Sequence, residues 1–293
     1  MPLLTALLAC ALALASCGRA PADFDSSVAE AEALIGLGRA GPAASRYRSI
    51  ERAFRDDPRW AGVMLRIAEI ESNMLGDRAA ADRALSEVVR RAPLTEAGRI
   101  ARETRAGVRE ASGDYQGAIE DYTALMKHFP EGGRDMLYRV GLAGVYLTAK
   151  DFRQSRIEIK PLVEGKDVPP EVKEKAIFLA AESFFLDGQV RKAAGYYEWL
   201  MREFPESPLV PEAKLHLATC IEEMGHLGVA RDVTKGALDD YPNKGVVEAR
   251  LKSIDERGTR PAKQVRKELA ADSPRGEGPK GEPKKVYKEG ELN

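Results

Sequence analysis

The stretch EKAIFLAAESFFLDGQVRKAAGYYEWLMREFPES, from Glu174 to Ser207, decides the fold. Its first half spaces apolar residues three and four apart, on one face of an α-helix. Asp187-Gly188 then ends that helix, because glycine readily takes the positive φ that a helix end needs. The second half has its own apolar face, which includes Ala193, and stops at Pro205 because proline cannot continue a helix. We predict two antiparallel helices that cross at a small residue and need neighbours for their outer faces.

The same hairpin recurs along the chain. A small residue in the second helix marks each copy, and successive markers are 37, 37, 37, 38 and 37 residues apart: Ala44, Ala81, Ala118, Ser155, Ala193 and Ala230. A glycine precedes most of the markers, at Gly38, Gly76, Gly113, Gly188 and Gly225. A proline follows most of them, at Pro58, Pro93, Pro130, Pro205 and Pro242. Stacked copies bury the outer faces of their neighbours, so this period predicts a repeat architecture.

Copies such as GDYQGAIEDYTALMKHFP and GQVRKAAGYYEWLMREFP closely resemble the second-helix pattern of the tetratricopeptide repeat (TPR), a helical hairpin of about 34 residues. The resemblance covers roughly residues 25–244. It implies an all-α fold, a solenoid of about six TPR hairpins in a right-handed superhelix over residues 25–257, capping helix included. It also implies a non-catalytic scaffold that binds partner proteins through a concave groove lined by the first helices.

Composition agrees with a helical solenoid. Charged residues make up 31% of the 293 residues and aromatic residues only 6%, which is typical of thin helical layers. The net charge of −1 gives no indication of nucleic-acid binding. No internal run is long and apolar enough to span a bilayer. We therefore expect protein partners and no nucleic acid, and the oligomeric state stays open.

The N-terminal segment, residues 1–16, is short and apolar and is typical of a secretory signal peptide. The residues LASC that end at Cys17 resemble a bacterial lipobox, so we predict that Cys17 carries a lipid and that residues 17–24 form a linker. The sequence has no Lys or Arg before Cys17, unlike most signal peptides. Cys10 fits the same pattern loosely, and an apolar N-terminal helix cap is the alternative to an exported lipoprotein.

The C-terminal part changes character after the last repeat. Apolar residues within 246–254 predict one further helix that covers the last hairpin. From about Gly258 the chain is rich in Lys, Arg, Glu, Gly and Pro and cannot bury enough apolar surface to offset its conformational entropy. We predict that residues 258–293 form a disordered, charged, solubilising tail.

Three regions depart from the repeat pattern. Glu32 and Glu69 stand in the first two copies where later copies have alanine, and we expect the first helix of the second copy to be rotated. The third copy carries a basic stripe at helical spacing: Arg99, Arg102, Arg105 and Arg109. We expect these arginines to face water, as a solvated surface or as a site for an acidic partner or anionic headgroups. The fourth copy has Lys150-Asp151 in place of the turn glycine.

Residues with catalytic or metal-binding chemistry are few and scattered. His128, His216 and His226 are far apart and lack ligand spacing. Cys220 lies in an apolar helix, where a small buried thiol is expected. We expect no catalytic site, metal or cofactor; an envelope enzyme with unrecognised chemistry is a distant alternative.

The groove positions of the TPR family fall on apolar residues of the fourth and fifth copies: Leu137, Val140, Leu147, Phe178, Phe185 and Leu186. Phe184 and Phe185 are adjacent, so one helix face cannot bury both. We expect Phe185 to bind a partner in the groove, and packing against a neighbouring repeat is the alternative.

The chain also resembles periplasmic TPR lipoproteins of the outer-membrane assembly and Tol-Pal-associated kind. These proteins share hairpins that close on Phe-Pro or Tyr-Pro and continue into an Ala-rich helix, as in FPESPLVPEAKLHLATCIEEMG. The resemblance implies a lipid-anchored adaptor on the periplasmic face of the outer membrane, with other envelope proteins as partners. Gly18, in place of aspartate, favours the outer membrane. A soluble TPR adaptor or co-chaperone without the anchor is the alternative.

Overall fold

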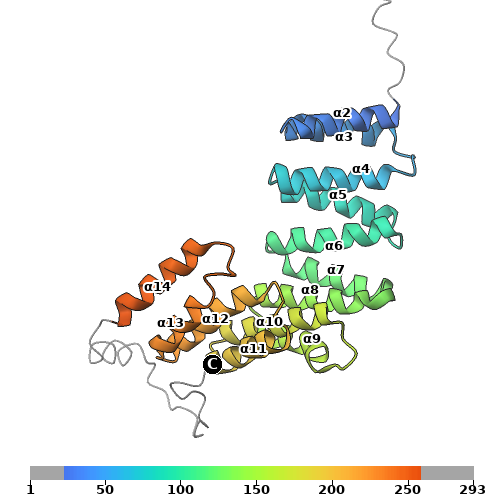
Figure 1. Cartoon of the computed structure of the whole chain (residues 1–293). Helices are drawn as coiled ribbons and strands as arrows, with labels where there is room; N and C mark the ends of the chain where they lie inside the picture. Colours follow the sequence, from blue (N-terminus) through green and yellow to red (C-terminus); the bar gives the residue numbers. More distant parts are fainter. Residues whose placement is uncertain (1–22, 259–293) are drawn as a thin grey trace, which may run out of the picture. The chain divides into compact units, whose positions relative to one another are not determined.

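The computed structural model describes residues 23–258, and this part is all-α, with no β-strand among the described residues (Figure 1). The elements in chain order are α2 (Phe24–Gly36), α3 (Ala40–Ala53), α4 (Trp60–Glu69), the π-helical turn η1 (Ile70–Met74), α5 (Arg78–Arg91), α6 (Glu96–Ala111), α7 (Tyr115–His128), the 3-10 turn η2 (Glu131–Gly133), α8 (Arg134–Thr148), α9 (Phe152–Glu164), α10 (Pro170–Leu186), α11 (Val190–Glu203), α12 (Val210–Glu223), α13 (Leu227–Lys235) and α14 (Lys244–Gly258). The predicted signal peptide, Cys17 and all but the first residue of the predicted tail lie outside the described residues.

The chain divides into two compact units, and the boundary falls after Tyr138, inside α8. Within each unit, consecutive helices pack as hairpins: α2 with α3, α4 with α5, and α6 with α7 in the first, and α10 with α11 and α12 with α13 in the second. The second helix of a hairpin also packs on the first helix of the next, as α5 does on α6 and α11 on α12. This order of contacts confirms the predicted stack of helical hairpins within each unit.

The marker residues lie in the packed interior, as predicted. All six are at most 1% exposed: Ala44, Ala81, Ala118, Ser155, Ala193 and Ala230. Large apolar side chains of the second helices, such as Leu85, Leu125, Ile159 and Leu200, are likewise buried. A residue without a bulky side chain at these positions lets the helices approach closely.

The turn inside each hairpin has one residue with positive φ followed by a helix cap. Five of these residues are the predicted glycines, and the sixth is Lys150, with a φ of 64°. Asp77, Asp114 and Asp151 then cap α5, α7 and α9, since each carboxylate accepts a hydrogen bond from the backbone N–H three residues later. The turn sequence Gly-Asp in the second and third hairpins, and Lys-Asp in the fourth, therefore ends one helix and begins the next.

The alignment of the first two copies requires a correction. Ala31, and not Glu32, is buried seven residues before the positive-φ turn residue Gly38, just as Ala181 is buried seven residues before Gly188. Measured from the same turn, Ala43 is the counterpart of Ala193, and its neighbour Ala44 is buried as well.

The second copy carries one extra residue in its first helix. Ala68, and not Glu69, is the buried alanine, and it lies eight residues before the turn residue Gly76. The π-helical turn η1 accommodates the additional residue, because the Leu75 N–H donates to the Ile70 carbonyl five residues earlier at 3.0 Å. We expected a rotation of this helix, and the structure shows instead a local π turn that takes up the additional residue.

The predicted covering helix is α14. Its Val247 and Ile254 are buried, and Val247 packs with Leu215 and Ala237 in a small apolar cluster. The helix α14 packs on α13 and thereby covers the last hairpin, formed by α12 and α13. None of the described helices is both long and apolar enough to cross a membrane.

Candidate functional site

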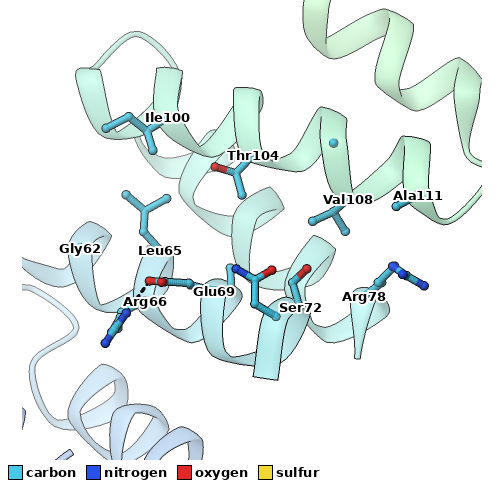
Figure 2. A pocket seen from close by; sticks show the side chains of 13 residues that line it. Gly62, Leu65, Arg66, Glu69, Ser72, Arg78, Ile100, Thr104, Val108 and Ala111 are labelled. Carbon is cyan, nitrogen blue, oxygen red and sulfur yellow. Dashed lines mark hydrogen bonds and ion pairs between the residues drawn. The ribbon is translucent and has the colours of Figure 1, made fainter. Parts of the chain in front are cut away.

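An open groove lies between α6 and the continuous α4–η1 segment, which are the first helices of the third and second hairpins (Figure 2). We call it the α4–α6 groove, and its volume is about 690 Å³. It lies wholly in the first unit. Its lining residues are Gly62, Leu65, Arg66, Ala68, Glu69, Ser72, Asn73, Arg78, Ile100, Thr104, Gly107, Val108 and Ala111.

One part of this groove is apolar. Figure 2 shows Leu65 projecting from α4 toward α6, where Ile100 and Thr104 face it. Ile100 is 37% exposed, and Val108 further along α6 is buried at the base. The small residues Gly62 and Gly107 leave space at the groove, because nothing lies within 4 Å of a Cβ built on either. An apolar side chain of a partner would find both space and contacts here.

The π-helical turn η1 shapes the other part. Ile70 and Glu71 point inward and are buried, and the Glu71 carboxylate receives the Arg48 guanidinium of α3. Ser72 and Asn73, the next two residues, line the groove. Single π turns inside α-helices are frequent at functional sites, because they redirect side chains that a regular helix would place elsewhere.

Several polar groups of the groove are free to bind a ligand. Within the described residues, the side chains of Ser72, Asn73, Thr104 and Arg78 make no hydrogen bond or ion pair. Arg66, by contrast, is held by Glu69 at 2.6 Å and by Glu32 of α2. The groove thus offers an amide, two hydroxyls and one uncompensated guanidinium beside an apolar surface.

Residues 175–207 match the family model of the tetratricopeptide repeat. A TPR protein from Parabacteroides merdae has a similar structure, with 14% identity, 85% of this chain and 97% of that chain covered, and a TM-score of 0.61. This chain has the TPR fold. The C-terminal part of a TPR repeat-containing protein from Cytophaga hutchinsonii is similar too, with 12% identity, 73% and 78% coverage and a TM-score of 0.52. No curated protein matches the chain significantly.

The groove residues predicted from the TPR pattern belong to different surroundings. Leu137 lies in the first unit and is 44% exposed. Val140 and Leu147 of the second unit are half-buried, and Leu186 is 52% exposed. A role of these residues in partner binding stays a prediction.

Phe178 and Phe185 pack against the neighbouring TPR. Their ring centroids lie 6.1 and 6.2 Å from that of His216 on α12, and both rings stack on the imidazole. The Glu182 carboxylate contacts His216 Nδ1 and accepts a hydrogen bond from the Tyr197 hydroxyl. The hydrogen bond to Glu182 raises the pKa of His216, and burial of the phenol raises the pKa of Tyr197. Phe185 therefore packs against an adjacent repeat, which was the alternative to partner binding.

The arginines of the basic stripe do not face water, and that expectation is wrong. Arg105 is buried, and its guanidinium donates to both carboxylate oxygens of the buried Asp121 at 2.8 and 2.5 Å. Arg109 binds Asp82 at 2.7 Å, whereas Arg102 comes no closer than 3.8 Å to Asp121. Arg99 is held between glutamates of its own helix.

The physical reason is that carboxylates of α5 and α7 pair with Arg105 and Arg109. Helical periodicity within α6 cannot predict partners that lie on other helices. The guanidiniums of Arg105 and Arg109 are engaged inside the protein. Binding of an acidic partner or of headgroups by the stripe stays untested.

The remaining candidates for chemistry are isolated. Cys220 is buried as predicted, and burial raises the pKa of its thiol to about 12, so the nucleophilic thiolate is scarce near neutral pH. Among residues 23–258, no group of three or more His, Cys, Asp or Glu side chains is arranged to hold a metal ion.

Proposed function

We propose that this protein is a non-catalytic TPR adaptor that binds a segment of a partner protein in the α4–α6 groove. The observation that carries the proposal is the combination in this groove of exposed apolar surface with free polar side chains. Leu65 and Ile100 supply the apolar part, and Asn73 and Arg78 supply the polar part. TPR folds are generally scaffolds for protein–protein interaction, which supports the same function.

The chemistry of the groove fits a segment with an aliphatic or aromatic anchor and a nearby carboxylate. The anchor would lie between Leu65 and Ile100 and would contribute about 1.5–3 kcal/mol by burial. The Asn73 amide would bond the partner backbone, and the Arg78 guanidinium would pair with the carboxylate.

Site-specific photo-crosslinking tests the proposal. A photoreactive amino acid at Asn73 should form adducts with a defined partner in living cells, and the same group at Leu94, which is 67% exposed outside the groove, should not. Ile100→Glu should abolish the Asn73 adduct, because it places a charge in the apolar part. Equal adducts at both positions, or adducts unaffected by Ile100→Glu, would refute binding in this groove.

We further propose that the adaptor is a lipoprotein of the bacterial cell envelope, anchored through Cys17 at the periplasmic face of the outer membrane, with other envelope proteins as partners. Support comes from the lipobox-like LASC sequence and from the resemblance to envelope TPR lipoproteins. Metabolic labelling with palmitate should label the wild type and not Cys17→Ala. Persistent labelling would point to Cys10, and an unlabelled wild type to the soluble adaptor.

A further inference from the structure

We propose a second docking surface in the second unit, between α9, α10 and α11, which binds an acidic segment carrying an apolar anchor. We call it the α9–α11 groove. Its volume is about 390 Å³. Its lining residues are Arg153, Arg156, Ile157, Ile159, Lys160, Val163, Glu164, Ala180, Phe184 and Tyr196. None of them belongs to the α4–α6 groove or to the residues expected to bind a partner from the TPR pattern.

The base of the α9–α11 groove is apolar and aromatic. Phe184 of α10 stacks on Tyr196 of α11 with ring centroids 5.3 Å apart, and Tyr196 in turn lies 5.8 Å from Trp199. Ile157 of α9 is 49% exposed at the same groove. Exposure of so large an aliphatic side chain beside stacked rings costs free energy that a bound apolar group would recover.

The sides of the groove are cationic. The Arg156 guanidinium lies 4.7 Å from the centre of the Phe184 ring, and the Lys192 ammonium lies 5.3 Å from it. Arg153 and Lys160 are exposed on the same helix as Arg156. Two cations therefore lie over the Phe184 ring, and Arg153 and Lys160 add two further positive charges on α9.

Neighbouring carboxylates compensate only part of this charge. Arg156 pairs with Asp187 at 2.9 Å, and Lys160 reaches Glu164 only at 4.0 Å. Within the described part of the chain, Arg153 makes no ion pair and Lys192 hydrogen-bonds only the Gln189 amide oxygen, at 2.8 Å. The lining cations Arg153, Arg156 and Lys160 exceed the carboxylates Glu164 and Asp187 by one positive charge, and Lys192 beside the Phe184 ring adds a second.

Charge complementarity decides between possible occupants. A segment with Glu or Asp next to Leu or Phe would place its carboxylates on Arg153 and Lys160 and its apolar group on Ile157 and Phe184. A second copy docked symmetrically through this surface would bring like charges together, which is unfavourable. We therefore infer an acidic segment of another protein as the occupant.

The test uses the full chain and two fluorescein-labelled peptides of twelve residues. One alternates Glu with Leu and carries a central Phe, and the other has Lys at every Glu position. Fluorescence anisotropy should show saturable binding of the acidic peptide only, weakening with salt. Arg153→Glu with Lys160→Glu should weaken it at least tenfold, and Ile157→Ala severalfold.

Lys235→Glu with Lys252→Glu is the matched control, because it makes the same change of charge at exposed positions outside the groove. It should leave the affinity within twofold. A Trp60→Phe variant adds a local readout, since its only remaining tryptophan, Trp199, neighbours Tyr196 and should change emission on binding.

Three results would overturn the proposal: equal binding of both peptides, an equal loss in the control variant, or binding of vesicles with 30% anionic lipid but of neither peptide. Ile100→Glu should not affect this binding, because it lies in the other unit. Failure of the α9–α11 groove is thereby distinguished from failure of the α4–α6 groove.

Discussion

The two units contain the same three-residue contact with a different cation. In the first unit, Glu32 accepts hydrogen bonds from Tyr47, fifteen residues later, and from Arg66, thirty-four residues later. In the second unit, Glu182 contacts Tyr197 and His216 at the same two separations. Each contact joins both helices of one TPR to the first helix of the next.

The cation decides how each contact responds to pH. The guanidinium of Arg66 stays protonated at all accessible pH values, and its hydrogen bond lowers the pKa of Glu32. Burial, followed by the hydrogen bond to Glu32, raises the pKa of Tyr47 to about 12. His216 can lose its proton, although Glu182 raises its pKa. One repeat interface is therefore fixed electrostatically, and the corresponding interface in the other unit can be weakened by base.

The packing around the cations differs as well. Arg66 has a second carboxylate, Glu69, at 2.6 Å, so its charge is shared. His216 instead stacks with the rings of Phe178 and Phe185. The same backbone arrangement thus supports an ionic junction in one unit and a mainly aromatic junction in the other.

The largest expected effect comes from replacing the buried alanine that lies four residues before the tyrosine of each contact. This alanine is Ala43 before Tyr47 and Ala193 before Tyr197. Ala193 is 0% exposed, so Ala193→Arg must overpack the helix crossing and bury a charge. We expect a loss of about 3–5 kcal/mol and a clearly lower thermal midpoint by circular dichroism. Gly195→Arg is the control on the same helix, where a Cβ meets nothing within 4 Å. Equal midpoints for the two variants would show that Ala193 is not at a packed crossing.

A smaller effect separates the two carboxylates. Glu32→Gln leaves Arg66 with a single carboxylate and should cost about 1 kcal/mol, a modest value because Glu32 is part-exposed. Glu182→Gln should cost less than this, and its cost should be smaller at pH 8.5 than at pH 6, because His216 loses its charge as pH rises through its raised pKa. Urea unfolding midpoints at the two pH values measure both. A pH-independent cost of Glu182→Gln would mean that His216 does not carry the charge assigned to it.

Much of this architecture follows from the sequence. The 37-residue period and the small markers predict the helical hairpins, because a repeat must place its smallest side chain where its helices cross. The alignment of Glu32 was wrong by one residue because the markers were counted from Ala44, where two buried alanines are adjacent. Counting from the turn glycine would have placed Glu32 and Glu182 at equivalent positions.

The α4–α6 groove was not predicted, and the signal for it was small. Gly38 and Gly76 are 38 residues apart, one more than the usual period of 37. The π turn η1 accommodates this one additional residue. The partners of Arg105 and Arg109 could not be found from helical periodicity at all, since Asp82 and Asp121 belong to other helices. Local pattern predicts elements, whereas side-chain pairing across repeats depends on their packing.

The turns offer a third comparison between the units. The three hairpin turns of the first unit have glycine at positive φ, whereas one of the three in the second unit has Lys150 there, at 64°. Lys150→Gly should stabilise the protein by about 0.5 kcal/mol, because it removes the steric cost of a side chain in this conformation but makes the unfolded chain more flexible. Lys150→Ala is the control, since it keeps the Cβ and should give no gain. A gain from alanine equal to that from glycine would place the cost in the lysine side chain and not in the backbone.

The smallest expected effect is the pH dependence itself. The folded pKa of His216 is raised above its value of 6.5 in the unfolded chain, chiefly by the hydrogen bond to Glu182. The stabilisation from its charge is therefore complete below about pH 6.5 and is lost as pH rises through the higher folded pKa. The effect is small because the His216 side chain is 31% exposed and solvent screens the pair. His216→Arg should remove the fall in thermal midpoint between pH 6 and pH 8.5, since a guanidinium also stacks on aromatic rings and stays charged. Titration of the His216 imidazole by NMR, in the wild type and in Glu182→Gln, checks the cause: the pKa should drop in the variant, and an unchanged pKa would remove Glu182 as the origin of the difference between the units.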